Sequence, residues 1–200
     1  GLENYELTKN LKTIINRLNY THLNEKIKEP TDENIAQWIR ESIGEKPIYA
    51  IGVQSTNNQG VYLCQESKKI HTWKRFSFEA AHKLPFVAKG HKCGRMHGHS
   101  FKVIIHFHEN ISSKSRLVDY ENMEKIWSPI DKLLNFSCLN DIKGLSNPTS
   151  ELISKWIWKK VVDHFFTPSF ISVYETNSCG AHYDGKNFVI WKDFTMDSAV

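Results

Sequence analysis

Gly90-His91-Lys92-Cys93-Gly94-Arg95-Met96-His97-Gly98-His99-Ser100-Phe101 is the most informative stretch of this 200-residue chain. The upstream segment Phe78-Glu79-Ala80-Ala81-His82 adds another histidine, and the hydrophobic pattern predicts strands near residues 72–80 and 101–107. Six of the ten histidines fall between His82 and His108. This concentration of imidazole groups between two expected strands indicates a functional site.

The histidine spacing favours a metal centre. His97 and His99 are two residues apart, so on an extended segment both rings point the same way, and His82 can complete a set of three. Three neutral imidazoles with an open fourth position are typical of a catalytic zinc rather than a structural one. His106 and His108 form a similar pair without a third partner, and we interpret them as structural or surface residues.

Cys93 admits two functional interpretations. It is a fourth metal ligand, because Cys-x3-His-x-His is a plausible ligand spacing, or it is a nucleophile or base. In the second case Lys92, Arg95 and the nearby cation favour the thiolate. The polar loop with its flanking glycine disfavours an inert, buried cysteine.

Composition restricts the class of protein. With 40% apolar and 12% aromatic residues, the chain can fill the core of one domain or two small ones. It has no apolar run of the roughly 18 residues that a membrane span needs and no signal pattern, so we expect a cytoplasmic protein without a membrane partner. Four separated cysteines without a CxxC disfavour a disulfide framework.

The net charge of +4 is unevenly distributed. Residues 1–70 hold nine basic and nine acidic residues, whereas the remainder holds 17 and 13. Between Glu79 and Glu109 the sequence has five basic residues and no acidic one. A basic rim of this kind suits a polyanionic small ligand such as a phosphate ester, and an ordinary solvated charge cluster is the alternative. Because no nucleic-acid-binding motif accompanies the charge, we expect no nucleic-acid partner.

Part of the sequence recurs at an offset of 116 to 120 residues, in the same order, which favours a tandem duplication. The corresponding pairs are Leu18–Glu25 with Leu134–Asp141, Glu29–Glu33 with Asn147–Glu151, and Ile51–Thr56 with Ile171–Thr176.

The predicted elements follow the same plan. The first unit, residues 1–70, reads α-α-β-β, with helices at 6–19 and 31–42 and strands at 48–54 and 60–64. The second, residues 71–200, reads β-β-α-α-β-β, with helices at 120–134 and 149–165 and closing strands at 171–176 and 188–191. The fold class is therefore α+β. Because the first unit lacks an opening hairpin, we expect a fragment or processed form of a longer tandem protein. A native chain-and-a-half is the rival interpretation.

Four separated motifs resemble the 6-pyruvoyltetrahydropterin synthase superfamily, and in particular the 6-carboxytetrahydropterin synthases of queuosine biosynthesis. They are Phe78–His82, Cys93-x3-His97-Gly98-His99, Asn147–Glu151 and Tyr174-Glu175-Thr176, in the family's order within residues 72–192. The resemblance also covers residues 2–66, as the C-terminal half of a preceding copy.

The resemblance implies a T-fold: a four-stranded antiparallel sheet with two helices on one face, assembled by homo-oligomerisation into barrels with active sites between subunits. It implies a Zn²⁺ ion held by His82, His97 and His99, with Cys93 as the proton-transferring thiolate and Glu175 gripping the pterin ring. The implied substrate is 7,8-dihydroneopterin triphosphate, and the implied products are 6-carboxytetrahydropterin, acetaldehyde and triphosphate. We assign Arg95 to the triphosphate from its charge.

The chain departs from the family's pattern at one pair of residues. Asn135-Phe136 stands where the family has Asp-His, and the first unit has Asn19-Tyr20 there. Three explanations compete: Tyr20 or His22 of another subunit replaces the pair, the pterin chemistry is altered, or the protein binds zinc and pterin without turnover. The first unit also has Ser55 at the position of Glu175, so its pterin anchor is missing.

Overall fold

The computed structural model describes residues 2–44, 48–64, 69–110, 119–162 and 167–198. The chain divides into two compact units, one of residues 1–72 and 108–115 and the other of residues 73–107 and 116–200. The proposed duplication boundary after residue 70 stays a prediction. Within the described ranges, no helix combines the length and apolar character that crossing a bilayer requires.

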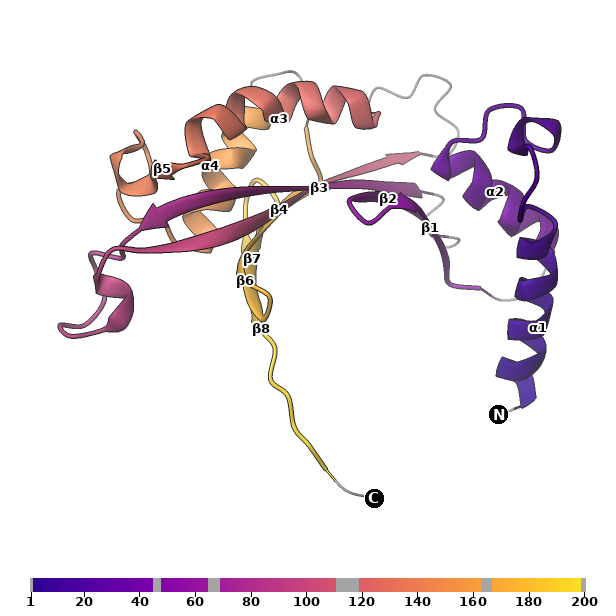
Figure 1. Cartoon of the computed structure of the whole chain (residues 1–200), viewed down its shortest axis with the longest axis horizontal. Coiled ribbons are helices and arrows are strands. Elements are labelled where there is room, and N and C mark those ends of the chain that lie inside the picture. Colours follow the sequence, from indigo (N-terminus) through magenta and orange to yellow (C-terminus); the bar gives the residue numbers. More distant parts are fainter. Residues whose placement is uncertain (1, 45–47, 65–68, 111–118, 163–166, 199–200) are drawn as a thin grey trace. The chain divides into compact units, whose positions relative to one another are not determined.

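The first unit contains two helices and a β-hairpin (Figure 1). The hydroxyl of Thr31 caps the second helix by accepting from Asn34 N–H, and Gly44 ends it with a positive φ of 77°. The apolar sides of the helices and the hairpin share a core that includes Ile14, Ile39 and Val61. The elements are α1 (Leu2–Asn16), the 3-10 turn η1 (Leu23–Glu25), α2 (Asp32–Ile43), β1 (Ala50–Thr56) and β2 (Gln59–Cys64).

The second unit is an antiparallel sheet with α3 and α4 packed on one face (Figure 1). Its strands are ordered β3-β4-β6-β7-β8, and the short β5 pairs in parallel with β3. The strands are β3 (Lys69–His82), β4 (His97–Asn110), β5 (Ser137–Cys138), β6 (Phe170–Thr176), β7 (Cys179–Tyr183) and β8 (Phe188–Lys192). The helices are η2 (Lys92–Gly94), α3 (Tyr120–Leu134), η3 (Leu139–Asp141) and α4 (Ser150–Val162).

Strand alternation builds the core of the second unit. Phe78 of β3 and Phe101 of β4 stack at 4.9 Å between ring centroids, and Trp127 of α3 lies 6.3 Å from Phe78. Burying each such ring contributes about 1.5–3 kcal/mol. Because side chains two residues apart share a face, this same face carries His82 and His99 at the ends of the strands.

The predicted α+β plan is confirmed, but the strand prediction at the C-terminal end was wrong in one respect. It missed β7, which lies between β6 and the strand predicted at 188–191. The missed segment, Cys179-Gly180-Ala181-His182-Tyr183, has no β-branched residue and includes a glycine, so it lacks the usual strand signal. The Asp184-Gly185 turn therefore joins β7 to β8. Residues 163–165 of the predicted helix 149–165 lie outside the described residues.

The hairpins β1–β2 and β6–β7 have the same register, displaced by 120 residues. Ile51 faces Leu63 as Ile171 faces Tyr183, and both ladders shift register just before their last pair. That last pair is Thr56 with Gln59 in one hairpin and Thr176 with Cys179 in the other. The offset equals that of the sequence match Ile51–Thr56 with Ile171–Thr176, which supports the duplication hypothesis.

Candidate metal and ligand site

Three histidines converge where β3 ends and β4 begins. The ring centroids lie 4.6 Å apart for His82 and His97, 5.2 Å for His82 and His99, and 4.9 Å for His97 and His99. Alternation along β4 puts His97 and His99 on one face, and pairing with β3 brings His82 beside them. The structure therefore brings together the three residues that the sequence selected.

Backbone carbonyls orient two of the rings. Nδ1 of His82 lies 2.8 Å from the Pro148 carbonyl oxygen, and Nδ1 of His97 lies 2.8 Å from that of Arg95. A carbonyl oxygen only accepts, so each Nδ1 carries the proton and each Nε2 keeps its lone pair. Metal-binding histidines are commonly fixed in this way.

The Nε2 atoms of His82 and His99 are buried, and in the described part of the chain neither has a hydrogen-bond partner. A buried polar nitrogen without a partner is costly, and a bound cation is one way to satisfy it. Burial is the main cause that lowers the pKa of both residues, although Glu175 opposes it. Both rings are therefore neutral near pH 7, the form that binds metal.

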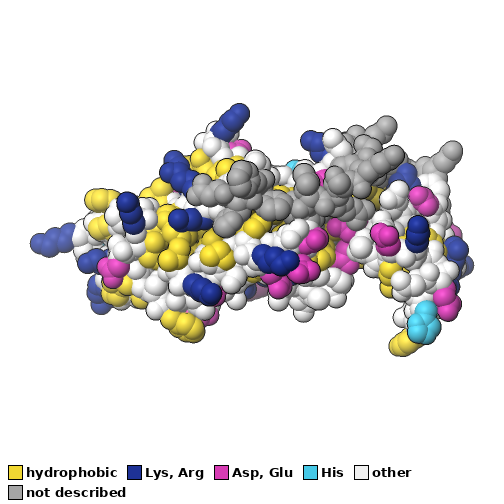
Figure 2. Space-filling view, turned by 90° about the horizontal axis from the view of Figure 1, so that it is seen from above, with side chains coloured by type: hydrophobic (Ala, Val, Ile, Leu, Met, Phe, Trp, Pro, Cys, Tyr) yellow, Lys and Arg dark blue, Asp and Glu magenta, His cyan; other side chains and the backbone are white. Residues whose placement is uncertain are grey.

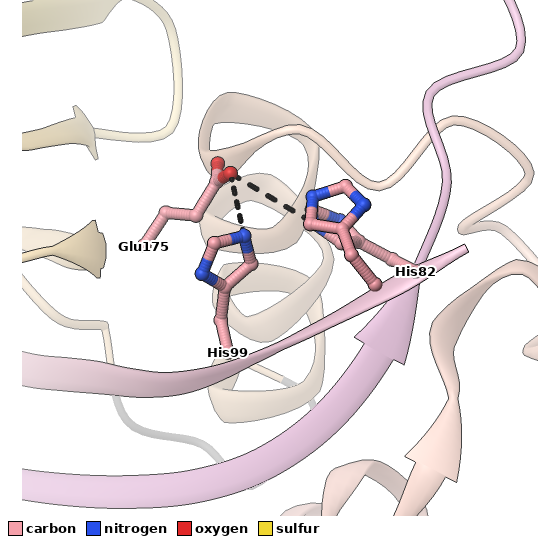
Figure 3. A group of neighbouring side chains, drawn as sticks. His82, His99 and Glu175 are labelled. Carbon is pink, nitrogen blue, oxygen red and sulfur yellow. Dashed lines mark ion pairs between the residues drawn. The ribbon is translucent and has the colours of Figure 1, made fainter. Parts of the chain in front are cut away.

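Glu175 completes the cluster from β6. Its Oε1 lies 3.2 Å from His99 Nε2 and 3.7 Å from His82 Nε2, and all three side chains point toward one another (Figure 3). Ligand atoms of the three histidines and Glu175 all lie within 4.8 Å of one another, so the residues fit a single metal ion. The sequence selected Glu175 for another role, and nothing local in it signals this proximity.

Comparisons with known proteins place the second unit in a known family. Residues 71–186 match the family model described as 6-pyruvoyl tetrahydropterin synthase. A 6-carboxy-5,6,7,8-tetrahydropterin synthase from Synechocystis is 35% identical over 119 residues, 56% of this chain and 90% of the relative. A putative enzyme of the same name from Archaeoglobus fulgidus is 31% identical over 88 residues, covering 44% and 71%.

The chain belongs to the 6-pyruvoyl tetrahydropterin synthase family. Among solved structures, an uncharacterized protein from Wolinella succinogenes has a TM-score of 0.50 at 16% identity, covering 59% of this chain and 99% of its own. The 6-pyruvoyl tetrahydropterin synthase of Caenorhabditis elegans has a TM-score of 0.49 at 20% identity, covering 63% and 96%. The second unit has the antiparallel sheet and one-sided helices of the family's T-fold.

Cys93 lies in η2, within the loop that joins β3 to β4. Its N–H donates to His91 Nδ1 at 3.1 Å, and its carbonyl accepts from Leu84 N–H at 2.8 Å. Among the described residues, its thiol is not in the group whose ligand atoms converge within 4.8 Å. This placement favours the nucleophile or base hypothesis for Cys93 over the ligand hypothesis.

Arg95 is exposed and lines a cavity of about 280 Å³ together with Lys89 and other residues of the same loop. Its backbone carbonyl orients His97, which ties the loop to the histidine cluster. On the face drawn in Figure 2, Lys and Arg side chains are dispersed among hydrophobic and acidic ones.

Asn135 and Phe136 fasten the end of α3 to β3. The Asn135 side-chain oxygen accepts from Glu79 N–H at 2.9 Å, and Phe136 N–H donates to the Glu79 carbonyl at 2.6 Å. Phe136 has a φ of 55° and its side chain is 86% exposed, at a cavity of about 440 Å³ that Ser100 also lines. These contacts join the two elements, and neither a carboxamide nor a phenyl side chain is a proton-transfer group near neutral pH.

The structure gives defined contacts for His106, one of the two histidines that we interpreted as structural or surface residues. His106 is buried, stacks on Phe170 at 4.0 Å, and its Nε2 lies 2.9 Å from the Ser172 hydroxyl. That hydroxyl lies 2.7 Å from His182 Nδ1. His106 is thus a hydrogen-bonded core residue, as predicted.

Proposed function

We propose that the chain is a zinc-dependent 6-carboxytetrahydropterin synthase-like lyase that acts on 7,8-dihydroneopterin triphosphate in queuosine biosynthesis. The observation that carries the proposal is the convergence of His82, His97, His99 and Glu175, whose ligand atoms all lie within 4.8 Å of one another. His82, His97 and His99 would hold the zinc. When bound, such an ion polarises a coordinated substrate oxygen and acidifies the neighbouring C–H group.

Other residues of the chain would transfer the proton and bind the substrate. The thiol of Cys93, as thiolate, takes or relays the substrate proton, because it lies in the loop that leads directly into His97. Glu175 has two acceptor oxygens that suit parallel N–H groups on a pterin edge, and the Ser150 hydroxyl donates to one of them at 3.4 Å. Arg95 binds the triphosphate. We propose that the working form is a homo-oligomer with sites between subunits.

A second candidate function is zinc and pterin binding with altered chemistry or without turnover. It is favoured by the contacts of Asn135 and Phe136, whose polar groups bond to the backbone of Glu79. If proton transfer needs a partner for the thiolate, Tyr20 or His22 of another subunit has to supply it. Cys93 favours the enzyme over this alternative, because a binding protein has little use for a thiolate.

The test is turnover by the full chain loaded with zinc. Wild type, Cys93→Ala and Cys138→Ala are incubated with 7,8-dihydroneopterin triphosphate while acetaldehyde and pterin products are followed. We expect product from wild type and Cys138→Ala, and a loss of at least about 100-fold in Cys93→Ala with zinc content unchanged. Wild type that binds zinc and pterin without product would overturn the lyase proposal.

The double variant Asn135→Asp/Phe136→His separates the two candidates. If the absent proton-transfer pair limits the rate, the double variant forms product faster than wild type, with unchanged zinc content. If wild type is inactive and the double variant gains activity, the second candidate function is correct for the natural sequence.

A further inference from the structure

The first unit has a cavity of its own, and none of its lining residues belongs to the three-histidine cluster. Its volume is about 490 Å³, within the usual range of small-molecule sites. Lys69 and His71 come from the start of β3, where alternate residues share a face, and His108 comes from the end of β4. The side chains that line it are Tyr49, Tyr62, Cys64, Lys69, His71 and His108.

Aromatic rings form much of the wall. The ring of Tyr62 lies 5.7 Å from that of His71, and His71 meets His108 edge to face at 4.6 Å. The side chains of Tyr49 and Tyr62 are 74% and 42% exposed, so large ring surfaces are accessible. Aromatic side chains pack favourably against another planar ring in stacked or edge-to-face geometry.

Two histidines and one lysine decide the charge of the wall. Burial, and then His108, lower the pKa of His71 to about 4, and burial, followed by Lys69, lowers the pKa of His108. Both imidazoles are therefore neutral near pH 7, and the positive charge at this cavity comes from Lys69. Among the lining residues that the structure describes, none is acidic. A wall of neutral rings with one ammonium group and no described acidic residue suits a ligand that carries a negative charge.

We propose that this cavity binds a planar aromatic anion, with its ring against Tyr62 and His71 and its acidic group at Lys69. A metal ion is the weaker alternative, because Cys64, His71 and His108 are not among the described groups whose ligand atoms converge. The site is separate from the proposed lyase chemistry and does not depend on it.

The test uses naphthalene-2-sulfonate as the probe, titrated calorimetrically into the full chain near pH 7. We expect saturable binding at one site per chain, about tenfold weaker in Lys69→Gln, where one charge-assisted contact is lost. Lys92→Gln, which removes the same charge from the second unit, should bind like wild type. Neutral 2-naphthalenemethanol should bind wild type at least about tenfold more weakly than the sulfonate.

Two further variants locate the probe. Tyr62→Leu removes an aromatic wall and should weaken binding, whereas Glu175→Gln should not change it. Circular dichroism verifies that each variant is folded. Absence of saturable binding at millimolar probe, or equal affinity of wild type and Lys69→Gln, would overturn the proposal. Displacement of the probe by 7,8-dihydroneopterin triphosphate with loss in Glu175→Gln would also overturn it, because the probe would then occupy the histidine site.

Discussion

The hairpins β1–β2 and β6–β7 share a register, but the side chains that join each hairpin to its preceding helix are exchanged. In the first unit the carboxylate belongs to the helix: Asp32 at the start of α2 accepts from the Ser55 hydroxyl of β1 at 3.0 Å. In the second unit it belongs to the strand: Glu175 of β6 accepts from the Ser150 hydroxyl at the start of α4 at 3.4 Å. Ser55 occupies the position that corresponds to Glu175, and Asp32 the position that corresponds to Ser150. The serine and the carboxylate have therefore exchanged places between the two units.

The reversal decides which of the two carboxylates is available to a metal or a pterin. Asp32 is 5% exposed and also lies 3.4 Å from Ser55 N–H, so its carboxylate locks α2 to the sheet. The side chain of Glu175 is 19% exposed and faces His99. One carboxylate therefore stabilises the fold, whereas the other is available to a metal or a pterin.

The largest expected difference between the units is in metal binding. We expect one zinc per chain, with affinity reduced more than about 100-fold in His82→Ala, since even an outer partner of a ligand is worth about 10–100-fold. His22→Ala, an exposed histidine of the first unit, should leave affinity unchanged. Zinc content and competition with a chromogenic chelator measure both. A second zinc lost only in His22→Ala would contradict the comparison.

Glycine substitution should affect the two hairpins unequally. A Cβ on Gly180 would lie 2.5 Å from the Val173 carbonyl oxygen and 2.5 Å from the Trp191 ring, and the carbonyl cannot move away easily. A Cβ on Gly52 would meet the Tyr62 ring at 2.9 Å, and that exposed ring can rotate. We expect Gly180→Ala to cost about 1–3 kcal/mol of unfolding free energy in urea, and Gly52→Ala clearly less. Equal costs would show that the second hairpin is not the tighter one.

The exchange of serine and carboxylate is tested by removing one residue of the contact in each unit, Asp32 in the first and Ser150 in the second. Asp32→Ala should cost about 1.5 kcal/mol of unfolding free energy, because it removes a charged acceptor from a buried contact. Ser150→Ala removes a longer contact at 3.4 Å and should cost less than about 1 kcal/mol. Urea unfolding measures both variants. A larger loss in Ser150→Ala than in Asp32→Ala would reverse the proposed division of roles.

The smallest expected effect is a pH dependence that arises in the first unit. The pKa of His71 is about 4 in the folded chain and about 6.5 when unfolded. As the pH falls, the unfolded state therefore binds the proton at a higher pH than the folded state does. Its contribution to stability is therefore complete above pH 6.5 and is lost as pH falls toward 4. His71→Gln should reduce the acid-side loss of unfolding free energy by about 1 kcal/mol or less after solvent screening, which is measured as a smaller decrease in Tm. His22→Gln should have the wild-type profile, and an unchanged slope in His71→Gln would refute the assignment.

The sequence predicted helices well where hydrophobic periodicity and caps agree. The helix expected at 120–134 is α3, and the one expected at 31–42 is α2, displaced by one residue. The prediction from sequence failed at β7. The residues of β7 have little intrinsic strand preference, and they form a strand by pairing with β6 and β8.

The sequence by itself determined the three-histidine set, since spacing along a strand dictates which rings share a face. It also identified the family. Three features were decided only by the tertiary structure. They are the Pro148 carbonyl that fixes the His82 tautomer, the position of Glu175 beside the His82 ring, and the cavity of the first unit. These contacts join residues distant in sequence, so they depend on how the strands pair and not on any local pattern.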